Sequence, residues 1–534
     1  MHFVVCRTNA RSTSIGRPLI CYQGVRRELL RILSAQIFGY AITERDKKAV
    51  CEMSKWLFGS VFLMGLLCCS ALGQEANVAV PVTASLPDAG AIAVAAPSNA
   101  SVQSTLNTGD QAWMLASSAF VLLMTPGLAF FYGGLVGRKN VLSILMQCFM
   151  CMALVTVLWV FVGYSIAFSG TEIGGGFCGN PLTHFLLDGV KTDASFEPVT
   201  NVKLGISQQT FMVFQMMFAI ITPALIIGAF AERMKFLSFT LFIGLWSVLV
   251  YSPVAHWVWY GPALPNGLPH PLFGLGSFSA KDAVPEGALD FAGGTVVHIN
   301  AGIAALVACL VLGPRRGYPH QITPPHNLPF AILGAGLLWF GWFGFNGGSA
   351  FGANPQAVQA FVTTQVAAAT AGLVWSLIEL IRNGKPTALG MITGVVAGLV
   401  GITPAAGFVD VKAALIIGAG ATIISYIFVA FVKPALKYDD SLDVFGVHGM
   451  AGIFGALATG WFAQQGFGIG RLGGGVPQLL LQAKAVGITI LYSGVMSFIL
   501  LKLIDFTIGL RCTEDSEKMG LDLSDHAETA YTIS

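Results

Sequence analysis

Two histidines lie in very apolar stretches of the chain, and each follows a valine. His298 belongs to "GGTVVHINAG", and His448 belongs to "FGVHGMAG", 150 residues later (448 − 298). An ionisable side chain inside a hydrocarbon layer persists where it has a partner or a function. Paired neutral imidazoles can accept and donate protons near neutral pH, so the pair predicts a proton relay. In the alternative interpretation, each ring only bonds a backbone carbonyl at a helix interface.

Acidic residues precede both histidines. Asp290 lies eight residues before His298, where its simplest role is to cap a helix N-terminus; its charge would also favour a cation nearby. Asp443, five residues before His448, is interpreted as a second cap. Two histidines without a nearby Asp, Glu or Cys ligand do not make a zinc site. No metal or other cofactor is therefore predicted.

Aromatic residues gather in two other apolar segments. In "VFQMMFAIITP", Phe214 and Phe218 lie one helical turn apart with Gln215 beside them, and "GWFGFNGGSA" contains Phe345 and Ser349. Such a stripe in a membrane helix is typical of packing or lipid contact. A gate across a permeation path is the alternative, and spacing does not decide between the two.

The composition is that of a polytopic membrane protein. Of the 534 residues, 54% are hydrophobic and 10% charged, against roughly 25% charged in soluble domains. The net charge of +2, and the lack of a basic run interleaved with aromatic residues, argue against a nucleic-acid partner. Cys148 and Cys151, at i and i+3, are best explained as small apolar fillers.

Eleven segments are long and apolar enough to cross a hydrocarbon core, which requires roughly 20 residues. We expect an all-α polytopic membrane protein with these eleven transmembrane helices, at about 112–132, 141–168, 210–231, 237–258, 289–312, 328–346, 357–381, 388–408, 413–431, 445–462 and 483–508.

Basic residues occupy alternate, mostly short connections between these segments. The five basic loops contain Arg138/Lys139, Arg233/Lys235, Arg315/Arg316, Arg382/Lys385 and Lys433/Lys437. The positive-inside rule makes these loops cytoplasmic. With eleven spans, the N-terminus is then outside and the C-terminus cytoplasmic.

The first hundred residues have a layered organisation. From Met53, a short basic region, an apolar region and the site Ala71-Leu72-Gly73 predict a secretory signal peptide over residues 53–73. Residues 1–52 are then an upstream extension or a mis-annotated start. Residues 74–109 form a low-complexity extracytoplasmic lead.

The chain also contains a weak internal sequence repeat. "VHINAGIAALVA" from Val297 and "VHGMAGIFGALA" from Val447 relate the fifth span to the tenth. Weaker pairs keep the same order: "ITPA" at Ile221 and Ile402, and "FYGG" with "FNGG". Five helices per unit require the second unit to insert upside down, so we expect inverted five-helix repeats plus an eleventh helix.

Several long motifs together resemble the ammonium transporter family, and its Amt/Mep branch more than its Rhesus branch. They include "TPGLAFFYGGLVGRKNVLS", "GAFAERMKF", "GALDFAGGTVVHINAGIAALV", "WFGWFGFNGGSA" and "DVFGVHGMAGIFGAL", and the resemblance spans about Asp110 to Ser534. It implies an eleven-helix transmembrane domain over 110–508, a homotrimer with one pore per protomer, and nitrogen uptake across the inner (plasma) membrane.

The resemblance also implies roles for individual residues. Trp259, Ser349 and Phe218 match the outer substrate recruitment site, and Phe345 would stack on Phe218 as a gate. His298 and His448 match the pore histidines, whereas Asp290, Phe214 and Gln215 match supporting positions near the entrance and pore. Ammonium would bind at the aromatic site, lose its proton and cross as ammonia, while the histidines carry the proton separately.

Two segments stand apart from these motifs. The connection 260–286 is longer than in the shortest family members, and the charged segment 509–534 resembles the family's cytoplasmic regulatory tail, which in bacteria couples to PII-type signal proteins. A solvated tail is the simpler interpretation. An ammonium sensor that signals through this tail is the alternative function. An enzyme is not indicated, because the sequence offers no evident nucleophile or metal set.

Overall fold

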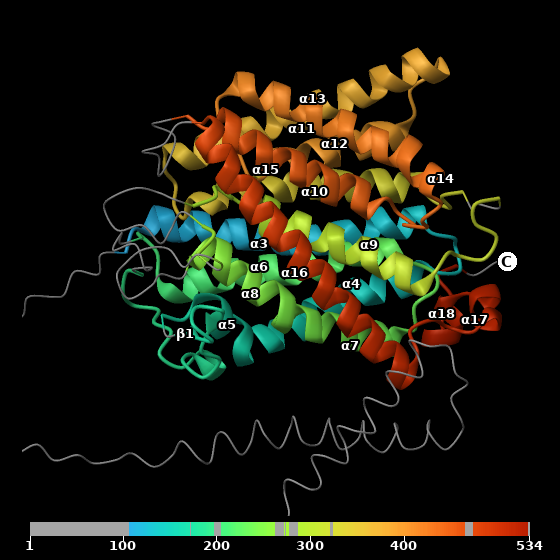
Figure 1. Ribbon diagram of the computed structural model, residues 1–534, viewed down its shortest axis with the longest axis horizontal. Helices are drawn as coiled ribbons and strands as arrows, with labels where there is room; N and C mark the ends of the chain where they lie inside the picture. Colours follow the sequence, from blue (N-terminus) through green and yellow to red (C-terminus); the bar gives the residue numbers. More distant parts are fainter. Residues whose placement is uncertain are drawn as a thin grey trace, which may run out of the picture. The chain divides into compact units, whose positions relative to one another are not determined.

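The computed structural model describes residues 106–170, 172–196, 204–261, 272, 274–276, 287–320, 324–464 and 474–531. The predicted upstream extension, the signal peptide, residues 74–105 of the lead and most of the connection 260–286 lie outside the described residues. The described part is an assembly of long helices (Figure 1).

Nine helical segments in the described part are long and apolar enough to span a membrane. They are α3 (Thr108–Leu135), α4 to α5 (Val141–Phe168), α6 (Gln208–Phe230), α7 to η4 (Phe236–Tyr260), η6 with α9 (Gly294–Leu312), α10 with η7 (Leu328–Ala350), α11 (Pro355–Asn383), α13 to α14 (Val411–Leu436) and α16 (Val476–Ile508). Two shorter apolar helices, α12 (Ala388–Ile402) and η9 with α15 (Phe445–Met450, Ala451–Phe462), complete the predicted set. The all-helical polytopic fold is confirmed.

Polar residues start several of these helices. Asn107 accepts from the amides of Gly109 and Asp110 at the start of α3, and Ser207 accepts from Thr210 N at the start of α6. The first amides of a helix have no partner within the helix, and lipid supplies none. These caps therefore fix where the spans begin.

The two related helices that carry His298 and His448 cross each other closely. A Cβ atom at Gly302 would overlap the backbone of Gly449, and one at Gly452 would lie 3.2 Å from Ile299 Cγ1. Gly302 and Gly452 are 150 positions apart, and so are Ile299 and Gly449, so the crossing has approximate twofold symmetry. Small residues permit such close backbone approach in membrane helices. The crossing follows the inverted repeat that the sequence predicts.

The ends of the helix bundle differ. At one end, here called the tail end, the short helices α17 (Glu514–Met519) and α18 (Leu521–His526) pack beside α4 and α7 (Figure 1). At the other end, here called the Trp259 end, lies the small antiparallel pair β1 (Glu172–Ile173) and β2 (Cys178–Gly179). The segment α7 to η4 runs from Phe236, bonded to Asp525 in α18, to the Trp259 end.

Candidate functional site

A narrow cavity lies between the helices of both repeats. Apolar side chains make up most of its lining, and His298 and His448 are its only titratable residues; the lining consists of Met124, Leu128, Phe131, Ile221, Leu225, Val297, His298, Leu338, Trp342, Phe345, Val396 and His448. Ions that keep their charge are poorly stabilised in such surroundings.

The two histidine rings lie in nearly parallel planes in this cavity, with their Nδ1 atoms toward each other. Their Nδ1 atoms are 3.3 Å apart, and their rings are 5.3 Å apart between centroids with an interplanar angle of 19°. One Nδ1 must donate and the other accept, so the short contact holds a single proton between the two rings. The Nε2 atom of His298 is buried and has no hydrogen-bond partner in the described part of the chain.

Each histidine lies in a π-helical turn at the start of its span. His298 is in η6 (Gly294–Ile299) and His448 is in η9 (Phe445–Met450). π-turns widen a helix locally and occur often at functional sites. The sequence pattern did not predict these π-turns.

Asp290 caps the first of these turns. Its Oδ1 accepts from Gly293 N at 3.0 Å, and its Oδ2 accepts from Thr295 N and Val296 N at 2.9 and 3.1 Å. Both carboxylate oxygens are thus used by amides that a helix start leaves free. Asp290 fixes the turn that carries His298.

The second cap is not Asp443, so that part of the sequence interpretation was wrong. The side chain of Asp443 pairs with Lys433 Nζ at 2.6 Å, and the amide of Phe445 instead donates to Asp440 Oδ2 at 2.7 Å. Asp440 lies eight residues before His448, as Asp290 lies eight before His298. Unlike Asp290, it keeps one buried oxygen, Oδ1, without a partner among the described residues.

A series of aromatic rings leads from the Trp259 end to the histidines. Trp259 meets Phe218 edge to face at 5.6 Å, and Phe218 lies 4.3 Å from Phe345. Phe345 in turn lies 5.9 Å from His298. We call these four residues with His448 the aromatic series. Helices η4 (His256–Tyr260), α6, α10, η6 and η9 each contribute one member.

The supporting residues lie around this series. Phe214 packs edge to face on Phe218 at 4.9 Å. Ser349 donates to the carbonyl of Phe345 at 2.8 Å, which leaves its own oxygen able to accept. Gln215 is buried, and its Oε1 has no partner in the part that the structure describes.

A hydrogen bond to the backbone orients the Trp259 indole. Its Nε1 donates to the carbonyl of Asp290 at 3.0 Å, and 8% of the residue is exposed. The same residue that caps the His298 turn thus also orients Trp259. The sequence suggests no such link, because the two residues are separated by a long connection.

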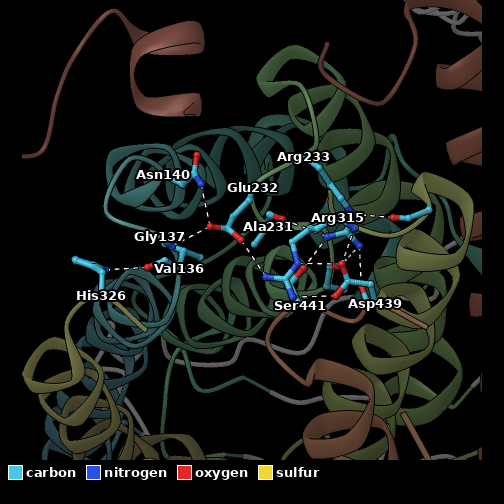
Figure 2. Close-up of polar contacts among 12 residues, drawn as sticks. Val136, Gly137, Asn140, Ala231, Glu232, Arg233, Arg315, His326, Asp439 and Ser441 are labelled. Atoms are coloured by element: carbon cyan, nitrogen blue, oxygen red, sulfur yellow. Dashed lines mark hydrogen bonds and ion pairs between the residues drawn. The ribbon is translucent and has the colours of Figure 1, made fainter. Parts of the chain in front are cut away.

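The tail end holds a partly buried charge cluster that sequence reasoning missed (Figure 2). Arg315 pairs with Glu232 at 3.0 Å and with Asp439 at 2.9 Å. Burial raises the pKa of Glu232, but Arg315 and hydrogen bonds from Gly137 and Asn140 outweigh it and hold this pKa below its ordinary value. The pKa of Asp439 is lowered in the same way, because Arg315 outweighs burial.

Arg233, fully buried beside this cluster, joins three loops. Its guanidinium donates to the carbonyls of Ala229, Ala231, Gly313 and Asp439 and to the hydroxyl of Ser441. The C-terminal segment attaches to the same place, since Cys512 N donates to the carbonyl of Arg233 at 3.0 Å. Arg233, in one of the basic loops that predict the topology, is therefore held inside the protein by hydrogen bonds and is not free in solvent.

The C-terminal helices also bind the connection between α3 and α4. Ser143 N donates to Asp522 Oδ1 at 2.8 Å, and Leu521 N donates to Asn140 Oδ1 at 2.8 Å. Lys139 Nζ donates to the carbonyls of Glu517 and Lys518. The C-terminal helices thus contact the bundle at these points, while Glu514, Asp515 and Lys518 remain exposed, as the simpler interpretation of the tail expects.

The fold and the site define a multi-pass helical membrane protein with an apolar, histidine-containing cavity between two repeats. The sequence profile of the Ammonium Transporter Family matches residues 112–531. An ammonium transporter of Aquifex aeolicus is 47% identical over 437 residues, which cover 81% of this chain and 95% of the relative. The chain belongs to the Ammonium Transporter Family.

Solved structures agree. The crystal structure of Saccharomyces cerevisiae Mep2 is 33% identical, with a TM-score of 0.67, and the match covers 77% of this chain and 89% of that one. A structure described as a sensor Amt protein is 28% identical, with a TM-score of 0.69, and the match covers 78% and 98% of the two chains.

Proposed function

We propose that this protein conducts ammonium across the membrane in two parts, ammonia and a proton. Ammonium binds at the Trp259 end, loses a proton there, and crosses the apolar cavity as ammonia. The observation that carries this proposal is the aromatic series. It runs from the almost fully buried indole of Trp259 to a histidine pair inside an apolar cavity.

Recruitment rests on Trp259, Phe218 and Ser349. An ammonium ion over aromatic faces gains roughly 0.5–2 kcal/mol of cation–π attraction, and the free oxygen lone pairs of Ser349 can accept an ammonium N–H. Phe214 and Gln215 support this entrance. The charge of Asp290 favours a cation nearby without direct contact, because its carboxylate oxygens are already bonded to amides.

Selectivity follows from the stacked phenylalanines and the apolar lining. Phe218 and Phe345 act as the gate, with ring centroids 4.3 Å apart. Potassium and sodium cannot shed their charge, so the cavity imposes a desolvation penalty that they do not escape. Ammonium escapes the penalty by leaving its proton behind.

The histidine pair carries that proton. Neutral imidazoles joined through Nδ1 atoms at 3.3 Å can pass a proton by exchanging donor and acceptor roles. Proton and ammonia then move separately, and the sum is one positive charge per ammonia. The reaction needs no covalent intermediate, so the protein works as a channel-like transporter and not as an enzyme.

Topology and assembly complete the proposal. By the positive-inside rule, the basic loops support a cytoplasmic tail end, with the Trp259 end outside the inner (plasma) membrane. A signal peptide over 53–73 precedes the lead, and residues 110–508 form the transmembrane domain. Residues 509–534 form the regulatory tail, which offers a docking site for a PII-type signal protein. Three copies assemble, each with its own pore, for nitrogen uptake.

An ammonium sensor is the second candidate function. Similarity to a protein described as a sensor Amt protein favours it, as do the contacts of Asp522 and Leu521 with the bundle. In this function, ammonium binding in the cavity changes the tail contacts, and transport is secondary.

Electrical measurement on proteoliposomes separates the two functions. Purified protein should give a current on addition of ammonium that scales with the ammonium gradient and is absent with potassium or sodium. Ligand binding without any current would overturn the transporter and leave the sensor.

A further inference from the structure

Gln482, on the helix outside the two repeats, uses its whole side-chain amide in hydrogen bonds. Its Oε1 accepts from Leu289 N at 2.6 Å and from Gln478 Nε2 at 3.3 Å. Its Nε2 donates to the carbonyls of Leu289 and Ala456 at 2.8 and 2.9 Å. The side chain is buried, with 1% of the residue exposed.

These bonds clamp the peptide groups directly before Asp290. Leu289 lies in an irregular segment, so its buried N–H and C=O find no helical partner and depend on the side chain of Gln482. Gln478 adds a bond from its Nε2 to the carbonyl of Gly287 at 3.1 Å. From the other side, Phe291 N donates to the carbonyl of Pro404.

The clamped segment controls two parts of the site at once. The carbonyl of Asp290 accepts from Trp259 Nε1, and the Asp290 carboxylate caps the turn that carries His298. A shift of Leu289 moves Asp290, the next residue, and changes the angle at which the Trp259 indole meets Phe218.

The clamp also joins the two repeats. In Figure 1, α16 runs obliquely across the bundle, and it packs against α7 and α9 of the first repeat and α15 of the second. Gln482 bonds Leu289 in the first repeat and Ala456 in the second. α16, which has no counterpart in either repeat, therefore links the first repeat to the second at the Trp259 end.

We propose that Gln482 is a positioning residue for the recruitment site: it holds the Asp290 peptide, and through it the Trp259 indole, at the angle that binds ammonium. The inference rests on the proposed function. It predicts an effect on substrate affinity, whereas a purely structural role predicts an effect on the amount of folded protein.

The first test replaces Gln482 by methionine, which has a similar volume and no amide. In proteoliposomes, Gln482→Met should raise the half-saturating ammonium concentration at least threefold, with the maximal current per inserted protein within twofold of wild type. An unchanged half-saturating concentration would overturn the proposal. Gln482→Glu keeps an acceptor for Leu289 N and should give a smaller shift; it provides the same comparison where the methionine variant is not recovered folded.

The matched control is Ser493→Ala on the same helix. Ser493 is also buried and donates to the carbonyl of Asn300 at 2.8 Å, away from the clamped segment. It should lower thermal stability without moving the half-saturating concentration. An equal shift in both variants would assign the effect to loosening of α16 and overturn the proposal.

A double-mutant cycle tests the route through Asp290. Trp259→Phe keeps an aromatic ring but removes the N–H that bonds the Asp290 carbonyl. Added to this variant, Gln482→Met should change the half-saturating concentration less than twofold, because the link is already broken. Fully multiplicative effects would overturn the route. If Trp259→Leu leaves the half-saturating concentration of an active protein unchanged, the recruitment site itself is wrong, which is a distinct result.

Discussion

His298 Nδ1 and His448 Nδ1 lie 3.3 Å apart, although 150 residues separate them in the chain. The contact joins corresponding positions of two repeats that run in opposite directions. A pair made in this way lies at the centre of the repeat pair, enclosed by an apolar lining. Because the pair lies inside this apolar lining, the first prediction concerns a separate path for the proton.

Replacing His448 by aspartate should change ion selectivity. A carboxylate in the apolar cavity compensates the charge of a metal cation that cannot lose it, so His448→Asp should give a potassium current that we expect to be absent in the wild type. Currents in proteoliposomes with each cation measure this. His256→Asp is the control, since His256 is buried but lies outside the cavity lining. Unchanged ammonium current and unchanged selectivity would refute the relay.

Removing the indole of Trp259 should weaken ammonium binding. The loss of about 0.5–2 kcal/mol of cation–π attraction corresponds to a roughly 2- to 30-fold higher half-saturating concentration in Trp259→Leu. Concentration dependence of the current provides the measurement. Trp257→Leu serves as control, because that indole bonds the carbonyl of Phe177 and is not in the aromatic series. A similar shift in both variants would contradict a specific role for Trp259.

The capping role of Asp290 predicts a graded loss of stability. Asp290→Ala leaves three buried amides without an acceptor and should lower the free energy of unfolding by about 2–5 kcal/mol. Asp290→Asn retains one carbonyl oxygen and should lose less. Thermal unfolding in detergent compares the variants. Equal losses for alanine and asparagine would show that the bonds to Gly293, Thr295 and Val296 are not what stabilises this turn.

Asp440 predicts a stability difference that depends on pH. Burial raises the pKa of its carboxyl to about 6, against 3.8 for an ordinary Asp, although Lys433 nearby opposes the shift. The folded state therefore binds more protons than the unfolded state between about pH 4 and 6, and stability falls as pH rises through this window. The shift corresponds to about 3 kcal/mol.

Asp440→Asn should remove this dependence. The titratable groups that interact with Asp440 are Lys433, Asp443, Tyr132, Tyr438 and Cys309, and all of them remain in the variant. Relative to wild type, the variant should gain stability between pH 4.5 and 7.5, measured as the midpoint of thermal unfolding. A constant difference between the two proteins across this range would contradict the prediction.

Breaking the tail-end cluster should destabilise the protein strongly. Arg315→Gln leaves the partly buried Glu232 and the buried Asp439 without their cationic partner, which should lower the free energy of unfolding by about 1–3 kcal/mol. Because both acids have lowered pKa values, the wild type loses this stabilisation as pH falls into their titration range. Arg316→Gln, at the exposed neighbouring position, is the control. Comparable losses in both variants would show that the ion pairs of Arg315 contribute little.

Much of this protein follows from sequence alone, because lipid imposes simple rules on a chain. Length and hydropathy predict the spans, since each must bury its backbone polar groups across one hydrocarbon core. The offset between His298 and His448 predicts the repeat. The motifs around Trp259, Phe218 and Phe345 suggest residues that the structure brings into ring contact.

Only the tertiary structure decided how polar side chains pair. Arg315 was a loop charge in the sequence, but its partners Glu232 and Asp439 lie 83 and 124 residues away. Asp440 rather than Asp443 caps the His448 turn, because helix packing, not proximity along the chain, directs each carboxylate. In the sequence, Gln482 is only one polar residue in an apolar span. The structure shows that its side chain bonds the carbonyls of Leu289 and Ala456. Hydropathy is a property of each residue by itself, whereas a buried hydrogen bond needs two groups that only the folded chain brings together.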